Sequence, residues 1–181
     1  MPIRPEPSAK TIILKTVVAH TVTYFVMGVL AFVLLDYQRL YADTDLKYLM
    51  RQTTEPIVMA GPLFQPLRGL IFGIAFVLLR RAWLEQDTGW LRLWVVLVCL
   101  GIVGTFGPAV GSVEGMIYTT LPLGLHFIGA PEVLLQSLLL SFVVFYWVRH
   151  PEKRWLRWVM GAAFGLVLFL PTLGLLVGQA E

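Results

Sequence analysis

Apolar residues are gathered into long segments that are separated by short polar stretches. The apolar segments cover residues 11–35, 66–83, 90–106, 131–148 and 155–177. Each is close to the length of about 20 residues that a helix needs to cross a hydrocarbon core of roughly 30 Å. The pattern therefore predicts an all-α fold, a polytopic membrane bundle of about five transmembrane helices that forms a single domain over residues 1–181.

The start of the second segment is ambiguous, because Gly61, Pro62 and Pro66 interrupt it. Proline is tolerated in the first turn of a helix and is costly in its interior. We therefore predict that this helix begins near Pro66 and that residues 56–65 dip into the headgroup layer. Residues 36–55, the longest charged connection, are expected to form an aqueous or interfacial loop.

The connection over residues 107–130 is unusual, because it has no Lys or Arg and is too rich in glycine and proline for a continuous span. Irregular backbone at membrane depth is tolerated only where it is buried in protein or lines a cavity. We predict a re-entrant or tightly packed loop on the outer side of the bundle.

Composition supports the membrane assignment, since 57% of the residues are hydrophobic and 14% are charged. The net charge of +3 does not indicate a nucleic-acid partner, because the basic residues stand at the ends of apolar segments, where they meet lipid headgroups. The chain has one cysteine, Cys99, which excludes an internal disulfide framework. No cofactor motif is present.

The distribution of basic residues predicts the orientation, because cytoplasmic loops carry the excess of Lys and Arg. One predicted side holds Arg4, Lys10, Arg80, Arg81, Arg92, Arg149, Lys153, Arg154 and Arg157, and the other holds Arg39, Lys47 and Arg51. The N-terminus is therefore expected in the cytoplasm and the C-terminus outside. Tryptophans are expected to form a cytoplasmic aromatic belt, at positions 83, 90, 147, 155 and 158.

Several glycine pairs have the GxxxG spacing that lets two helix backbones approach closely. The pairs are Gly69/Gly73, Gly107/Gly111, Gly111/Gly115, Gly161/Gly165 and Gly174/Gly178. The pairs inside predicted helices are expected to be packing sites.

Polar residues from separate segments are predicted to converge on the outer side. These candidate ligand-binding residues are Gln65, Arg68, Ser112, Glu114, Tyr118, His126, Glu132 and Gln136. A charge in hydrocarbon needs a partner, so Arg68 is expected to pair with a carboxylate, first of all Glu114 and next Glu132 or Glu55. Two interpretations remain open: a structural ion pair with His126 capping a turn, or a pocket in which Arg68 binds an anionic group and Glu114, His126 or Glu132 handles protons.

His20 lies in an apolar segment, where a histidine is expected to hydrogen-bond to a neighbouring helix. Glu114, His126 and Glu132 are ligand types that metals use, but their spacing matches no zinc pattern, so no metal site is predicted.

The leading functional hypothesis is a non-enzymatic membrane protein, either an accessory subunit or a binder of a lipid or small anion at the outer pocket. The first alternative is an enzyme that acts on a lipid or lipid-linked substrate, with Glu114, His126 or Glu132 as candidate catalytic residues. The second is a proton-coupled carrier. Expected partners are membrane lipids, other membrane subunits or further copies of the chain. The expected location is the cell membrane, specifically a prokaryotic inner membrane.

Overall fold

The computed structural model describes residues 6–178, and every regular element in this range is helical. The long helices are α1 (Ala9–Leu34), α4 (Gly61–Leu78), α6 (Gly89–Val98), α9 (Ala130–Arg149) and α10 (Arg154–Gly178). Short helices connect them: α2 (Tyr37–Asp43), a 3-10 turn (Asp45–Tyr48), α3 (Pro56–Met59), α5 (Arg80–Leu84), α7 (Val113–Tyr118) and α8 (Leu123–Ile128). A π-helical turn, Cys99–Val103, extends α6.

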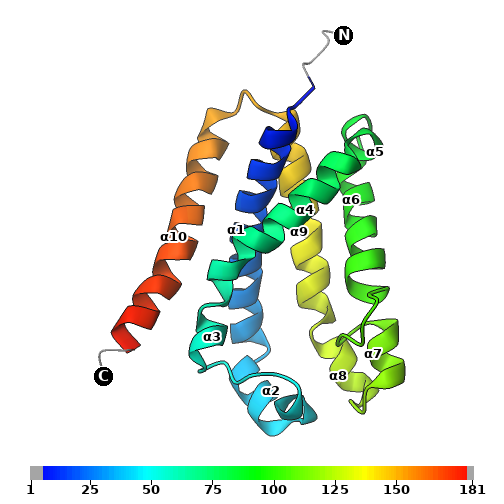
Figure 1. Cartoon of the computed structure of the whole chain (residues 1–181), viewed down its shortest axis with the longest axis vertical. Helices are drawn as coiled ribbons and strands as arrows, with labels where there is room; N and C mark the ends of the chain where they lie inside the picture. Colours follow the sequence, from blue (N-terminus) through cyan, green and yellow to red (C-terminus); the bar gives the residue numbers. More distant parts are fainter. Residues whose placement is uncertain (1–5, 179–181) are drawn as a thin grey trace.

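Four helical stretches are long and apolar enough to cross a membrane: Ala9–Leu34, Gly61–Leu78, Leu123–Arg149 and Arg154–Leu176. α1 is at the centre and packs against α4, α9 and α10, while α6 lies against α9 (Figure 1). The molecule has two ends. We call the end with α2, α7 and α8 the α8 end, and the opposite end, where α1 begins and α9 turns into α10, the α5 end (Figure 1).

α1 tolerates buried polar residues because their hydroxyl groups bond to the helix itself. Thr16, Thr21 and Thr23 are buried, and they donate to the carbonyls of Ile12 at 2.8 Å, Val17 at 2.9 Å and His20 at 3.3 Å. A satisfied hydroxyl avoids the free-energy cost of a buried unpaired one. α1 begins where Ser8 caps it by accepting a hydrogen bond from the Thr11 amide.

The crossing of α1 and α4 depends on two glycines. A Cβ atom on Gly69 would lie 2.8 Å from Cα of Val17, and one on Gly73 would lie 3.0 Å from Cα of Ile13. No larger residue fits at Gly69 without moving a backbone. The packing role predicted for the Gly69/Gly73 pair is therefore confirmed. At Gly161 and Gly165 a Cβ would meet nothing within 4 Å, so within the described chain that pair packs against no helix.

The predicted boundaries need three corrections. α4 begins at Gly61 and continues through Pro66, because neighbouring helices can offset the hydrogen bond that a proline removes. The stretch Gly89–Val103 is shorter than predicted and is not one of the four long apolar helices. α9 begins at Ala130, close to the predicted start at 131, but α8 leads directly into it, so that the apolar helical stretch starts at Leu123. Residues 107–130 thus contain two short helices and the start of a long one.

The apolar core lies toward the α5 end. Its buried side chains include Ile12, Phe76, Leu93 and Val144, and Trp83, whose indole N–H donates to the Phe76 carbonyl at 2.9 Å. The predicted aromatic belt is therefore wrong for two members: Trp83 and Trp147 are buried, whereas Trp155 and Trp158 are exposed.

Candidate functional site

A cavity of about 630 Å³ lies at the α8 end. We call it the tyrosine cavity. Its wall is mainly apolar and comes from α1, α3 and the connection between α2 and α3, and Tyr24, Tyr37, Tyr41, Arg51 and Glu132 supply most of its polar atoms. One face of α1 lines it at helical spacing through Tyr24, Gly28 and Phe32. A mainly apolar wall with few polar groups is typical of a small-molecule site.

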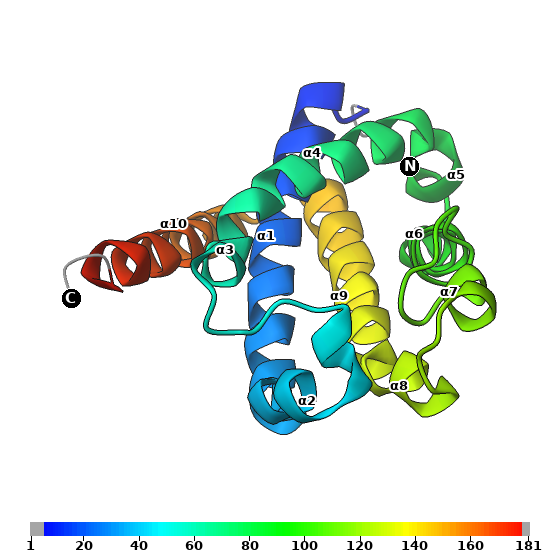
Figure 2. The ribbon, with the colours of Figure 1, turned by 60° about the horizontal axis from the view of Figure 1, so that its bottom comes forward.

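A sharp turn after α1 brings α2 over this cavity. Asp36 adopts a left-handed conformation, with φ 46° and ψ 59°, and its side chain caps α2 by accepting from the Arg39 amide. Aspartate tolerates this conformation better than most residues do. Figure 2 shows α2 folded beside the end of α1, with the connection to α3 running across α1.

The turn places Tyr37 against Glu132, which lies in the first turn of α9. The Tyr37 hydroxyl donates a hydrogen bond to the Glu132 carboxylate. The rings of Tyr37 and Tyr41 stack with centroids 5.1 Å apart. Burial first, and then the neighbouring Glu132, raises the pKa of both tyrosines. Both phenols therefore stay protonated at neutral pH and remain hydrogen-bond donors.

Residues 49–55, which we call the strap, close one side of the cavity. Arg51 pairs with Glu55 at 2.8 Å, and the other Glu55 oxygen accepts from the Gln52 amide at 3.2 Å. The Gln52 side chain donates to the Tyr41 carbonyl at 2.9 Å, which ties the strap to α2. The hydrogen bond from Arg51 is the main cause that lowers the pKa of Glu55.

A second, smaller cavity of about 180 Å³ lies between α2, α8 and the start of α9. It shares Tyr37, Tyr41, Met50 and Glu132 with the tyrosine cavity. Glu132 therefore stands between the two spaces. Gly28 is beside it, because a Cβ on Gly28 would lie 4.0 Å from a Glu132 oxygen.

Comparison with known proteins adds no assignment. No family model, curated protein or solved structure matches this chain.

His126 lines the smaller cavity, but both of its ring nitrogens are occupied. Nδ1 accepts from the Gly111 amide at 3.2 Å, and Nε2 lies 3.3 Å from the Thr119 hydroxyl. That hydroxyl gives its own hydrogen to the Gly115 carbonyl at 2.7 Å. Nε2 is therefore the ring nitrogen that donates to the Thr119 hydroxyl. His126 braces the turn at Gly111, which matches the structural interpretation of this residue.

The ion pair predicted between Arg68 and Glu114 does not form. Arg68 is exposed on α4 with its guanidinium carbon 5.5 Å from the centre of the Phe72 ring. It is in none of the ion pairs within residues 6–178. Neither Arg68 nor Glu114 lines the tyrosine cavity or the smaller cavity that shares Glu132 with it. Sequence spacing predicted a shared end of the bundle but could not predict which helix faces point together.

Most of the other candidates have local roles. The Gln65 side-chain oxygen is hydrogen-bonded to Nε2 of His20 at 3.1 Å. The expected hydrogen bond from His20 to a neighbouring helix is therefore confirmed. Ser112 caps α7 by accepting from the Gly115 amide at 3.0 Å. Tyr118 is 71% exposed, and Gln136 is half-buried on α9. Of the eight predicted residues, Glu132 is the one that lines the tyrosine cavity.

The described part of the chain has no cluster of three His, Cys, Asp or Glu side chains that could hold a metal ion. The alternative of a metal bound by Glu114, His126 and Glu132 therefore has no geometric support. Tyr24, Tyr37 and Tyr41 were not among the predicted site residues, because in an apolar sequence charged side chains are the stronger signal of a site. The spacing of Tyr24, Gly28 and Phe32 on α1, and of Tyr37 and Tyr41 on α2, was the available signal.

Proposed function

We propose that this chain is a multi-pass membrane protein that binds a lipid-like amphiphile in the tyrosine cavity, on the extracytoplasmic side. The observation that carries this proposal is the combination of an apolar wall on α1 with a small polar group. That group consists of Glu132 at the start of α9 and Tyr37 at the start of α2. An acyl chain matches the wall, and a headgroup matches the polar atoms.

The unequal distribution of basic residues between the two ends of the molecule supports the proposed orientation in the membrane. The α5 end carries Lys10, Arg80, Arg81, Arg92, Arg149, Lys153, Arg154 and Arg157, while the α8 end carries Arg39, Lys47 and Arg51. The excess of basic residues favours a cytoplasmic α5 end. We propose five crossings, with Gly89–Val103 as the short one. Fifteen residues rise only about 22 Å, and a partly re-entrant α7–α8 segment would compensate for the difference.

The chemistry of the cavity favours a headgroup that donates hydrogen bonds. Glu132 offers acceptor oxygens, and Arg51, the cation in the wall, already pairs with Glu55 at 2.8 Å. An anionic headgroup would meet the Glu132 carboxylate without a free cation to offset the repulsion. We therefore propose an amphiphile with a hydroxyl- or amine-bearing headgroup, in place of the anion that Arg68 was expected to bind.

Native mass spectrometry tests this proposal directly. The protein is extracted in mild detergent, and the lipid that stays bound is identified. Gly28→Leu fills the cavity beside Glu132 and is expected to remove the bound lipid. Gly101→Leu is the matched control, because a Cβ at Gly101 would meet nothing within 4 Å. Equal lipid retention by the two variants would contradict the proposal.

The second candidate function, an accessory subunit of a larger complex, is favoured by α10. This helix is mostly exposed, and nothing within the described chain packs against Gly161 or Gly165. A native gel of membranes solubilised under mild conditions decides this point. A complex much larger than one chain supports a subunit role, and a band at the mass of one chain with its lipid contradicts it.

A further inference from the structure

A second large cavity, also of about 630 Å³, lies at the α5 end. We call it the basic cavity. Its walls are the start of α1, the short helix α5, and the end of α9 with the turn into α10. These elements lie together at the top of Figure 1. The tyrosine cavity and the basic cavity have no lining residue in common.

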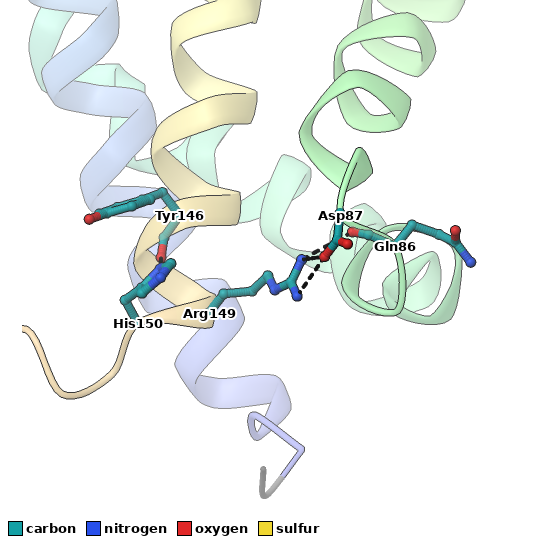
Figure 3. A network of polar contacts seen from close by, with 5 residues as sticks. All are labelled: Gln86, Asp87, Tyr146, Arg149 and His150. Atoms are coloured by element: carbon teal, nitrogen blue, oxygen red, sulfur yellow. Dashed lines mark hydrogen bonds and ion pairs between the residues drawn. The ribbon is translucent and has the colours of Figure 1, made fainter. Parts of the chain in front are cut away.

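Cations outnumber carboxylates in the lining. The cations are Lys15, Arg80, Arg81 and Arg149, and the carboxylates are Glu6, Glu85 and Glu152. Arg80 pairs with Glu6 at 2.9 Å. Figure 3 shows Arg149 extending from the end of α9 to the α5–α6 turn, where it pairs with Asp87 at 3.0 Å. This contact fixes one wall of the cavity.

Lys15 and Arg81 remain available within the described residues. Neither is in an ion pair there. Lys15 is half-buried, and its ammonium group donates to the Trp147 carbonyl at 2.7 Å. An ammonium group has three N–H donors, so Lys15 retains donors for a ligand. Arg81 is exposed and offers the planar fork that suits a phosphate.

We propose that the basic cavity binds a phosphate group, with Lys15 and Arg81 as its main contacts. Charge-assisted hydrogen bonds from Lys and Arg are the strong contacts that proteins use for phosphate. Glu6 already pairs with Arg80, and Glu85 and Glu152 limit the positive charge of Lys15 and Arg81, which suits one phosphate rather than a polyanion. The group can come from a phospholipid headgroup or from a soluble phosphate, since both present the same oxygens.

The test measures binding to the full-length protein in a neutral detergent by native mass spectrometry. The probes are dihexanoyl phosphatidic acid, a diacylglycerol of the same chain length without phosphate, and inorganic phosphate. Lys15→Gln and Arg81→Gln each remove one proposed contact. Arg92→Gln is the control, because Arg92 is a cation of the same end that does not line the basic cavity. It donates instead to the Ala82 carbonyl.

We expect phosphatidic acid to bind and the diacylglycerol not to bind. Each of the two variants should weaken binding by about tenfold or more, and Arg92→Gln should leave it unchanged. Competition by inorganic phosphate would identify a soluble phosphate as a sufficient ligand, and absence of competition would identify a lipid. Equal weakening by all three variants would show diffuse attraction and overturn the proposal. Arg81→Gln keeps the test valid if Lys15→Gln does not fold.

Discussion

Two polar residues that the sequence marks as candidate site residues, His126 and Glu132, have different surroundings in the structure. His126 is buried with both ring nitrogens bonded. Glu132 instead has one oxygen bonded to Tyr37 and lines two cavities. The sequence could identify both residues as candidates, because polar groups between apolar segments are uncommon. It could not separate them, because the difference depends on contacts with Gly111, Thr119 and Tyr37 that no local pattern specifies.

His126→Ala should destabilise the fold by about 1 to 3 kcal/mol, because it leaves the Gly111 amide without its acceptor and removes the contact with the Thr119 hydroxyl. Unfolding in detergent as a function of added SDS measures this free energy. A stability equal to that of the wild type would show that the His126 contacts do not brace the α7–α8 segment.

Gln65→Leu and Arg68→Gln should reduce the free energy of unfolding by different amounts, although the two residues are one turn apart on α4. Gln65→Leu leaves His20 without its one side-chain hydrogen bond in the core and should cost about 1 to 3 kcal/mol. Arg68→Gln changes an exposed side chain that has no ion pair within the described chain, so the loss should stay below about 1 kcal/mol. The same SDS titration compares them. A larger loss of stability for Arg68→Gln than for Gln65→Leu would indicate that Arg68 forms the ion pair that the sequence predicted.

At the scale of elements, hydropathy predicted the long helices well and their ends less well. α1, α9 and α10 begin and end within a few residues of the predicted spans. The start of α4 differs from the prediction, because a proline that would interrupt an isolated helix is tolerated in a helix that packs along α1. The predicted loop over residues 107–130 ends near Gly129, whereas α8 continues into α9 there. Tertiary packing, which local sequence does not encode, decided both cases.

The α1–α4 crossing provides a matched pair of glycine substitutions. Gly69→Ala puts a methyl group 2.8 Å from Cα of Val17, so the helices must separate, at a cost of about 1 to 3 kcal/mol. Gly161→Ala has open space on α10 and should be neutral or stabilising by up to about 1 kcal/mol, because alanine is the better helix former. Thermal unfolding in detergent compares the two. Equal changes in unfolding temperature for the two variants would contradict the close approach of α1 and α4 at Gly69.

The strap should respond to acid through Glu55. Its pKa is lowered in the folded state, so its contribution to stability is present above the unfolded pKa of about 4.3. That contribution is lost as the pH falls through the lower folded pKa. The midpoint temperature of thermal unfolding should be higher for the wild type than for Glu55→Gln at neutral pH. This difference should vanish in acid. A difference that stays constant down to the lowest pH would show that the Arg51–Glu55 pair does not hold the strap.

At the scale of the whole molecule, packing is uneven. The buried apolar core lies toward the α5 end, and the tyrosine cavity lies at the α8 end. The sequence predicted two chemically different ends, because basic residues collect at one of them. It offered a pocket at the outer end as one of two interpretations but did not predict the cavity at the basic end, since a cavity depends on how far the helices stand apart. The proposed functions of the two ends are accordingly different: an amphiphile at the α8 end and a phosphate group at the α5 end.

A crystal structure of the protein grown in a lipidic phase tests the central proposal most directly. We expect an elongated molecule along Tyr24, Gly28 and Phe32, with its headgroup within hydrogen-bonding distance of Glu132. In Gly28→Leu the same space should contain the leucine side chain and no lipid. A tyrosine cavity closed by the wild-type side chains themselves, with Glu132 in contact only with protein, would contradict the proposal that this end of the molecule binds an amphiphile.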